Sequence, residues 1–259
     1  MQAFNYSTPA TLADAKAALA AGAQALAGGQ SLIAAMKLGL NAPEKLVDLG
    51  GVKELRGITV SGGVVKVGAM TTHAEVATSA DVKKAIPALA ELASHIGDRQ
   101  VRNRGTIGGS LANADPAADY PAAALGLGAT IHTDRRDIAA DDFFKGLFET
   151  ALQPNELITA VSFPVPEKAG WQKFRQPASR FALVGVFVSK GPKGVRVAVT
   201  GAGASVFRAA DLEKKLAANW SAGALQGATV KSDGLNSDLH GSAEYRAALI
   251  PVLAARAVG

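Results

Sequence analysis

The chain has 259 residues and a formal net charge of +5, from 27 lysine and arginine residues against 22 aspartate and glutamate residues. Because 48% of it is hydrophobic and only 19% is charged, the composition predicts a globular protein and excludes a disordered one. The absence of cysteine excludes disulfides, thiolate catalysis, a flavin linked through cysteine and cysteine-ligated iron–sulfur clusters within this chain. The length exceeds that of one average domain, so we expect two.

Basic residues are scattered along the chain, and the densest group is Arg99, Arg102 and Arg104, with Arg135 and Arg136 further on. Aromatic residues make up only 5% of the chain. The positive charge therefore favours a surface for an anionic cofactor or partner, and we expect no nucleic-acid binding.

No apolar run is long enough to span a bilayer, and the most apolar stretches, such as Phe181–Val188, have the length of a strand. The N-terminal residues Met1–Tyr6 show no basic region followed by an apolar core. We therefore expect a cytoplasmic protein without a membrane span, and export together with a partner's signal stays open.

The first half of the chain alternates between helix and strand signals. An alanine-rich helix is expected to begin after Thr11, which can cap it, and to end at Gly22, with Asp14 in the first turn. Ser31 is the expected N-cap of a second helix. The other expected elements are strands over 24–27 and 45–49, helices over 32–38, 72–79 and 87–96, and a β-hairpin over 58–67.

The second half is expected to contain strands over 128–132 and 157–163, with a helix near Asp141–Thr150 between them. Helical spacing of Phe143, Phe144, Leu147 and Phe148 predicts a core or subunit-interface stripe on that helix. The proline-rich segment 164–170 is the expected domain linker. Beyond it we expect a hairpin over 181–200 and helices over 209–219 and 243–257.

Two glycine-rich segments stand out: Ala27–Ser31, between a predicted strand and a predicted helix, and Thr106–Ser110, between a basic helical stretch and residues 111–114. Paired glycines let the backbone approach a ligand closely, and successive amides near a helix start favour a phosphate. Taken singly, each segment is also explained as a tight turn, because neither matches a dinucleotide fingerprint or a P-loop. The two segments together suit an extended diphosphate held from both sides.

A rigid polar loop, Asn113–Pro121, follows the second glycine segment and carries Asp115 and Asp119. A carboxylate in such a loop can bind ribose hydroxyls, while Asp115-Pro116 is also a good turn start. The histidines His73, His95, His132 and His240 are not spaced as a metal site, so we expect surface or capping roles for them. No metal site and no Ser–His–Asp pattern is predicted.

Residues 27–37 (AGGQSLIAAMK) and 104–121 (RGTIGGSLANADPAADYP) resemble the two flavin-binding signatures of the FAD-binding (medium) subunit of molybdenum hydroxylases, the xanthine/aldehyde/carbon monoxide dehydrogenase type. Segments along the rest of the chain resemble that subunit too. They are FNYSTPATLADA, KLVDLG, VGAMTTHAEV, ELITAVSFPVP, KFRQPASRFALVGVFVS and AEYRAAL.

The resemblance implies an α+β fold. Residues 1–166 would form a vanillyl-alcohol-oxidase (PCMH)-type FAD-binding domain of two subdomains, and residues 167–259 a C-terminal domain of small antiparallel sheet and helices. FAD would lie in the cleft between them. It would be bound non-covalently, because cysteine is absent and His73 and His95 lie outside both glycine segments.

The resemblance also implies which residues contact FAD, none of them catalytic. These residues are Ala27, Gly28, Gly29, Gln30, Ser31, Leu32, Thr106, Ile107, Gly108, Gly109, Ser110, Asp115, Asp119, Leu157 and Arg175. Iron–sulfur clusters and the molybdenum cofactor would belong to a small and a large partner subunit, in a dimerised heterotrimer.

The expected role is an electron-transfer subunit, which takes electrons from the partner's iron–sulfur clusters and passes them to an external acceptor. A self-sufficient flavin oxidoreductase that acts on a small donor is the first alternative. A nucleotide-binding assembly module without redox turnover is the second. The large partner subunit would select the organic substrate, and the acceptor stays open between a quinone, NAD, oxygen and a carrier protein.

Overall fold

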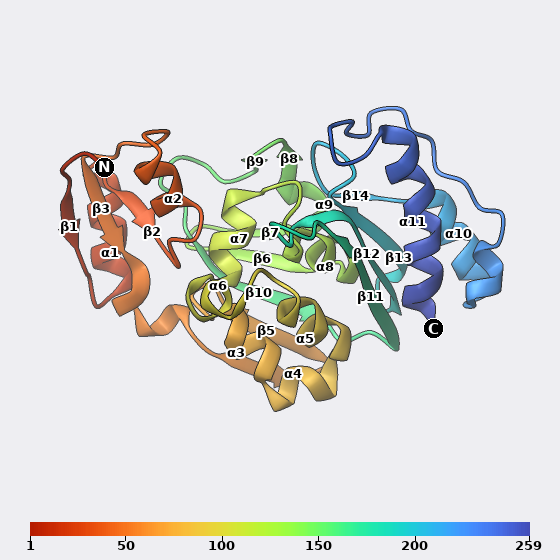
Figure 1. Cartoon of the computed structure of the whole chain (residues 1–259). Helices are drawn as coiled ribbons and strands as arrows, with labels where there is room; N and C mark the ends of the chain where they lie inside the picture. Colours follow the sequence, from red (N-terminus) through yellow and green to blue (C-terminus); the bar gives the residue numbers. More distant parts are fainter.

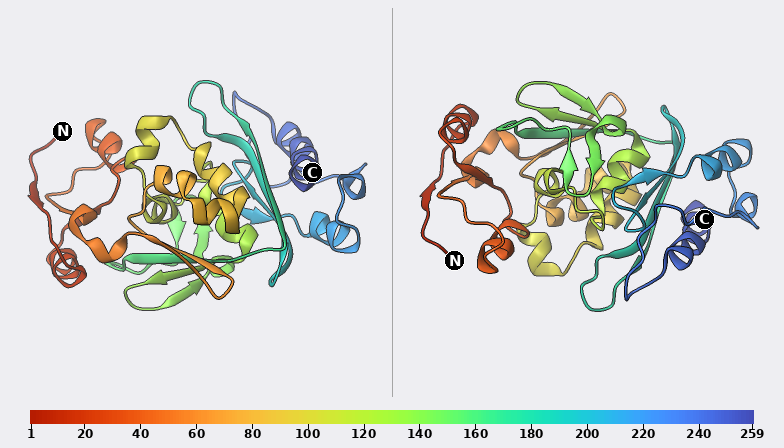
Figure 2. Two further views of the ribbon diagram at one scale, coloured as in Figure 1. Left: turned by 90° about the horizontal axis from the view of Figure 1, so that it is seen from below. Right: turned by 90° about the horizontal axis from the view of Figure 1, so that it is seen from above.

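The computed structural model describes all residues from 1 to 259. Three sheet-containing units follow one another along an elongated molecule (Figure 1), and the views from below and above show the same order (Figure 2). The N-terminal unit and the C-terminal unit lie at opposite ends, with the central unit between them.

The N-terminal unit is a parallel sheet of order β1-β3-β2, covered by two short helices. Thr11 caps the first helix as predicted, since its side chain accepts from the Asp14 amide. Ala15, Leu19 and Val47 form the core between helix and sheet. The elements are β1 (Asn5–Ser7), α1 (Leu12–Ala20), β2 (Gln24–Leu26), α2 (Leu32–Lys37) and β3 (Lys45–Asp48), followed by 3-10 turns Leu49–Gly51 and Lys53–Leu55.

The central unit is an antiparallel sheet of order β4-β5-β10-β6-β7. Alternation in β5 and β10 buries Val65, Val67, Val161 and Phe163 under the helices and leaves Lys66 exposed on the other face. The strands are β4 (Ile58–Ser61), β5 (Val64–Gly68), β6 (Thr130–Thr133), β7 (Asp137–Ala139) and β10 (Ile158–Pro164). The helices are α3 (His73–Thr78), α4 (Ala80–Ala85), α5 (Pro87–Ser94), α6 (Arg99–Arg104), α7 (Ile107–Asn113) and α8 (Tyr120–Leu127).

The C-terminal unit is an antiparallel sheet of order β11-β12-β13-β14, buried on both faces. Phe187 and Ala198 point into the central core around α8, while Val186 and Val197 pack against α10 and α11. This explains why Phe181–Val188 is a continuous apolar run instead of an alternating one. The elements are β11 (Lys168–Arg175), β12 (Ala182–Gly191), β13 (Gly194–Thr200), β14 (Phe207–Arg208), α10 (Ala210–Ala218), a 3-10 turn Ala222–Leu225 and α11 (Ala243–Val258).

The helix predicted near Asp141–Thr150 is wrong. A single turn, α9 (Ala140–Phe143), is followed by a small hairpin of β8 (Phe144–Gly146) and β9 (Glu149–Thr150). The aromatic spacing misled the prediction, because the main chain closes a hairpin in which Ala151 N donates to Phe143 O at 2.8 Å. Phe143 is fully buried, but Leu147 and Phe148 are 61% and 57% exposed, so no continuous stripe exists.

Two smaller predictions also need correction. Residues 168–170 belong to strand β11 and not to a linker, because Gly170 packs under the end of α11, where an added Cβ would lie 1.8 Å from Ala257 O. The glycines of the second segment lie in the first turn of α7 and not in a loop. No helix combines the length and the apolarity that crossing a bilayer requires.

Candidate cofactor site

A pocket of about 690 Å³ opens where the three units meet. The N-terminal unit contributes the segment after β2 and the start of α2. The central unit contributes α7, the loop after it, and the segment that leads into β10. The C-terminal unit adds Lys173 from β11 and the turn Ser179–Phe181 before β12.

The first glycine segment presents unused backbone donors to this pocket. The amides from Gly28 to Leu32 donate no hydrogen bond within the protein, and the Ser31 side chain forms no capping bond although Ser31 stands at the N-cap. Gly29 has φ +74°, which favours glycine. Consecutive free amides of this kind suit an anion such as a diphosphate.

In the second glycine segment, the amides from Ile107 to Ser110 all donate hydrogen bonds within the protein, so the segment presents no run of free amides. Gly108 N donates to Ala69 O at 2.8 Å, and Gly109 N donates to the Thr106 side chain at 3.2 Å. Gly28 lies directly on the residues that lead into this segment, since an added Cβ would come within 2.1 Å of Arg104 O and 2.7 Å of Gly105 Cα. The first glycine segment is therefore in backbone contact with Arg104 and Gly105, far away in sequence, and the expected second amide nest is absent.

Asp119 and Lys173 form a buried ion pair in the pocket, with Nζ 2.7 Å from Oδ2 and both side chains 4% exposed. The other carboxylate oxygen, Asp119 Oδ1, has no partner. Burial raises the pKa of Asp119 to about 6 against the lowering effect of Lys173. An unpartnered buried acceptor requires a donor, and a ligand hydroxyl would supply one.

His73 lies in the pocket wall and not on the surface, which corrects the expectation for it. It is 5% exposed, stacks at a tilt against Tyr120 at 5.3 Å, and its Nδ1 atom has no partner. Burial and nearby Arg102 lower the pKa of His73 to about 4, so the imidazole is neutral at pH 7. His95 is the C-cap residue of α5, which agrees with the surface or capping role expected for it.

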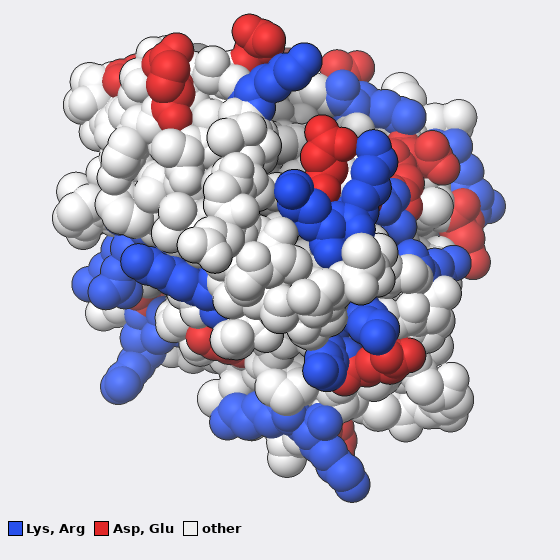
Figure 3. Space-filling view, turned by 90° about the vertical axis from the view of Figure 1, so that its right-hand side faces the viewer, with Lys and Arg blue, Asp and Glu red and all other residues white.

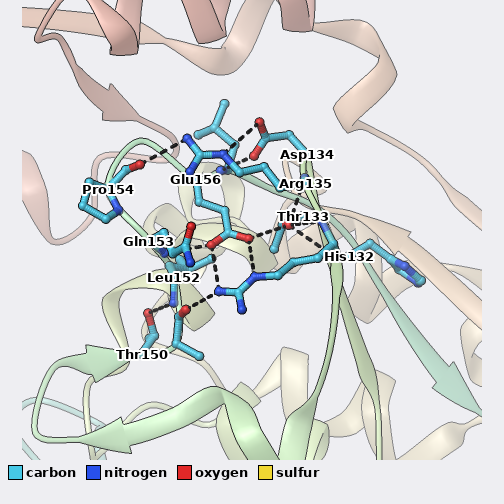
Figure 4. Close-up of polar contacts among 12 residues, drawn as sticks. His132, Thr133, Asp134, Arg135, Thr150, Leu152, Gln153, Pro154 and Glu156 are labelled. Carbon is cyan, nitrogen blue, oxygen red and sulfur yellow. Dashed lines mark hydrogen bonds and ion pairs between the residues drawn. The ribbon is translucent and has the colours of Figure 1, made fainter.

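A network of charged side chains fixes the segment that leads into β10 (Figure 4). Glu156 Oε1 and Oε2 accept from Arg136 at 3.0 and 3.1 Å, and Glu156 also accepts from Thr133 and the Gln153 amide. Asp134 Oδ1 accepts from the Leu157 amide at 2.8 Å. These bonds hold Leu157 at the pocket wall.

Of the fifteen residues predicted to contact the cofactor, all line the pocket except Ile107 and Arg175. Ile107 is buried in the central core, and Arg175 is exposed at the end of β11. A register shift between Phe174 and Arg175 breaks the alternation of the strand, so Lys173 and not Arg175 reaches the pocket. Lys173, His73 and Glu156 were missed, because only the fold brings them to the glycine segments.

Outside the pocket, one serine, one histidine and one aspartate side chain are connected by hydrogen bonds. The His132 ring bonds Asp137 and Ser162, each at 2.7 Å, across the neighbouring strands β7, β6 and β10. Ser162 lies within a strand that is paired on both sides, so no free amide is positioned beside it as an oxyanion donor. The arrangement is a cross-strand contact of the sheet. No group of three or more histidine and acidic side chains is placed to hold a metal ion.

The face around α10 and α11 shows basic and acidic groups intermixed with uncharged surface (Figure 3). Nothing on this face forms the continuous basic stripe that a nucleic acid would need. By contrast, the pocket offers free amides for a diphosphate, an unpartnered carboxylate for a hydroxyl, and apolar walls. Fold and site together define a protein whose pocket suits a dinucleotide cofactor.

Comparisons with known proteins specify the family. Residues 2–166 match the family described as the FAD binding domain in molybdopterin dehydrogenase. The nicotine 6-hydroxylase medium subunit of Paenarthrobacter nicotinovorans is 37% identical over 100% of this chain and 97% of its own length. The carbon monoxide dehydrogenase medium chain of Hydrogenophaga pseudoflava is 33% identical over 98% and 96%.

A chain of quinoline 2-oxidoreductase from Pseudomonas putida 86 superposes with a TM-score of 0.89 at 33% identity, covering 99% of this chain and 96% of that one. The chain therefore belongs to the FAD-binding medium subunits of the molybdenum hydroxylase family, as the glycine segments predicted.

Proposed function

We propose that this chain is the FAD-carrying electron-transfer subunit of a heterotrimeric molybdenum hydroxylase. It receives electrons from iron–sulfur clusters of a small partner subunit and delivers them to an external acceptor, while a large subunit holds the molybdenum cofactor. The observation that carries the proposal is one pocket lined both by the free amides from Gly28 to Leu32 and by Asp119, whose buried carboxylate has an unpartnered oxygen.

In this proposal, the residues of the chain bind and orient the cofactor and perform no acid–base chemistry on an organic substrate. The amides from Gly28 to Leu32 hold the diphosphate, and Asp119 accepts from a ribose hydroxyl. Lys173 keeps Asp119 ionised, and Leu157 supplies apolar contact. The bound flavin itself supplies the chemistry of accepting and releasing electrons. The predicted contact of Arg175 stays a prediction without support from its position.

The proposed layout is a PCMH-type FAD-binding domain of two subdomains over residues 1–166, followed by the C-terminal domain typical of these flavin proteins over residues 167–259. Two observations support this boundary. The family match ends at residue 166, and the third sheet begins with β11 at Lys168. The cytoplasmic location expected from the N-terminus stays a prediction.

The first test is an absorption spectrum of the purified chain and identification of what heat releases from it. We expect flavin bands and FAD close to one per chain. A colourless protein that also fails to take up added FAD would contradict the proposal.

Acid precipitation should release all yellow colour into solution, because the binding is expected to be non-covalent. Colour retained on the pellet would point to His73, the histidine in the pocket.

A second test separates the proposed role from a self-sufficient flavin oxidoreductase. Candidate organic donors are added to the purified, flavin-loaded chain, and bleaching of the flavin is followed. We expect no useful rate without partners. We also expect co-purification at one-to-one stoichiometry with a cysteine-rich subunit. Rapid bleaching by a small donor in the absence of any partner would favour the alternative.

A further inference from the structure

The turn between β8 and β9 places a phenylalanine in a strained conformation. Leu147 and Phe148 are its two turn residues, and Phe148 has φ +55°. A bulky side chain rarely adopts this left-handed region, which glycine or asparagine occupies in most turns. The strain costs free energy, so something must compensate for keeping phenylalanine here.

Packing within the chain does not provide the compensation. Phe148 is 57% exposed, whereas Phe143 at the base of the same hairpin is fully buried and packs edge-to-face on Phe144 at 5.1 Å. The aromatic pair at the base therefore anchors the hairpin, while the ring at the tip belongs to no aromatic pair and is more than half exposed.

The base of the hairpin is also fixed by hydrogen bonds, so the tip cannot relax by moving as a whole. Ala151 N donates to Phe143 O at 2.8 Å, and the Arg136 guanidinium donates to Ala151 O at 2.6 Å. Arg136 is itself held by Glu156, whose side chain is fully buried. The hairpin is thus a rigid arm that presents Phe148 at a defined place.

That place is the wall of the cofactor pocket. Phe148 lines it together with the glycine segment that carries the free amides, and with Leu157. Leu147, its equally exposed neighbour in the turn, does not line the pocket. The geometry points to Phe148 as a cofactor-contacting residue, whose ring packs against the FAD bound in this pocket and covers it from solvent. This inference rests on the proposed function.

A partner protein is the other candidate for contacting the exposed Phe148 ring, but it fits the structure less well. Docking of a protein would use both exposed apolar residues of the tip, whereas only Phe148 faces the pocket. A contact with the cofactor requires only the Phe148 ring, held in a fixed position at the pocket wall. A strained backbone on a rigid arm provides that placement.

The experiment compares FAD affinity and thermal stability of full-length variants. In Phe148→Gly, the strain and the ring are both removed. We expect the Tm of the FAD-free chain to rise by a few degrees and the Kd for FAD to increase about tenfold. In Phe148→Ala, the ring is lost but the strain remains, so affinity should fall without a gain in Tm. Phe148→Tyr should retain wild-type affinity.

Two variants are matched controls. Leu147→Ala removes the neighbouring apolar side chain of the same turn, and Asn155→Gly places glycine at another left-handed position, φ +60°, outside the pocket. Both should leave the Kd for FAD unchanged. An unchanged Kd in Phe148→Gly and Phe148→Ala would overturn the inference. If those two variants instead weakened only the complex with the iron–sulfur subunit, the turn would be a docking element.

Failure of this inference is distinguishable from failure of the proposed function. The wild-type chain must bind FAD before the variants are compared, and this binding tests the function alone. A wild-type chain that binds FAD with variants of equal affinity leaves the proposed function standing and removes the role of Phe148.

Discussion

At the scale of single residues, the buried carboxylate of Asp119 is expected to make FAD binding pH-dependent. Its pKa is raised to about 6, so the carboxylate becomes protonated below that pH. The neutral carboxylic acid is a weaker hydrogen-bond acceptor than the carboxylate. We expect FAD affinity to fall as the pH drops from about 7 to about 5. Equilibrium titration of the chain with FAD across this range measures the effect.

The same raised pKa affects the stability of the FAD-free chain in the opposite direction: FAD affinity rises with pH, but the free energy of unfolding should fall. Ionising a buried aspartate is unfavourable, so Asp119 should reduce stability as the pH rises from its ordinary value of 3.8 through about 6. Asp119→Asn should lower FAD affinity roughly tenfold and abolish the pH dependence of binding in this range. An unaltered pH profile in that variant would assign the titration to another group.

A second residue-scale prediction concerns Glu156, which has a pKa lowered to about 2, chiefly by its hydrogen bond with Arg136. Because the folded-state pKa is depressed, its stabilisation is complete above its ordinary value of 4.5 and is lost as the pH falls through about 2. Because Arg136 is 42% exposed and stays solvated when its partner is lost, Glu156→Gln should cost about 2 kcal/mol of unfolding free energy, measured by urea denaturation at pH 7.

The matched control for Glu156 is Asp211→Asn. Asp211 pairs with Lys214 at 3.1 Å, but the two side chains are 84% and 77% exposed. Solvent screens such a pair, so we expect a change below about 0.5 kcal/mol. Equal losses from both variants would show that burial of the Glu156 network adds nothing.

At the scale of elements, the contact between the first glycine segment and the end of α6 is expected to be intolerant of any side chain at Gly28. Gly28→Ala places a Cβ 2.1 Å from Arg104 O, so the segment before α2 must move away from the end of α6. We expect FAD affinity to fall more than tenfold while circular dichroism of the chain stays close to wild type. Gly223→Ala, whose Cβ would meet nothing closer than 3.8 Å, is the control and should be neutral.

Elements were predictable where the sequence pattern and local chemistry agree. The Thr11 cap, the hairpin of β4 and β5, and the long strands β12 and β13 follow from capping and hydrophobic patterning alone. The hairpin of β8 and β9 was missed, because Leu147 and Phe148 lack turn chemistry. Its turn is set by the anchored base, which only tertiary packing provides.

At the scale of the whole molecule, Lys173 connects the C-terminal sheet to the central unit through Asp119. Lys173→Met would leave Asp119 buried without its partner, at an expected cost of about 3–5 kcal/mol. Trp171, which is 1% exposed in the shared core, makes fluorescence-detected urea unfolding a suitable measurement. Lys168→Met, at the exposed start of the same strand, should have little effect.

The double variant Lys173→Met with Asp119→Asn tests the reason for this loss. Replacing the unpaired carboxylate by an amide removes most of the penalty, so the double variant should be more stable than Lys173→Met alone. If the losses of the two single variants simply added, the ion pair would not be the source of the cost. The central and C-terminal units would then be held together by apolar packing without a contribution from this ion pair.

The sequence by itself determined the family, the cofactor class and both glycine segments, because these depend on residue types that are rare in this order and at this separation. The tertiary structure decided how they act together. Only folding lays Gly28 on Arg104, turns Arg175 away through a register shift, and brings Lys173 to Asp119. It also packs the C-terminal sheet into the central core. Such contacts join distant residues, and no local pattern encodes the geometry of a contact made across units.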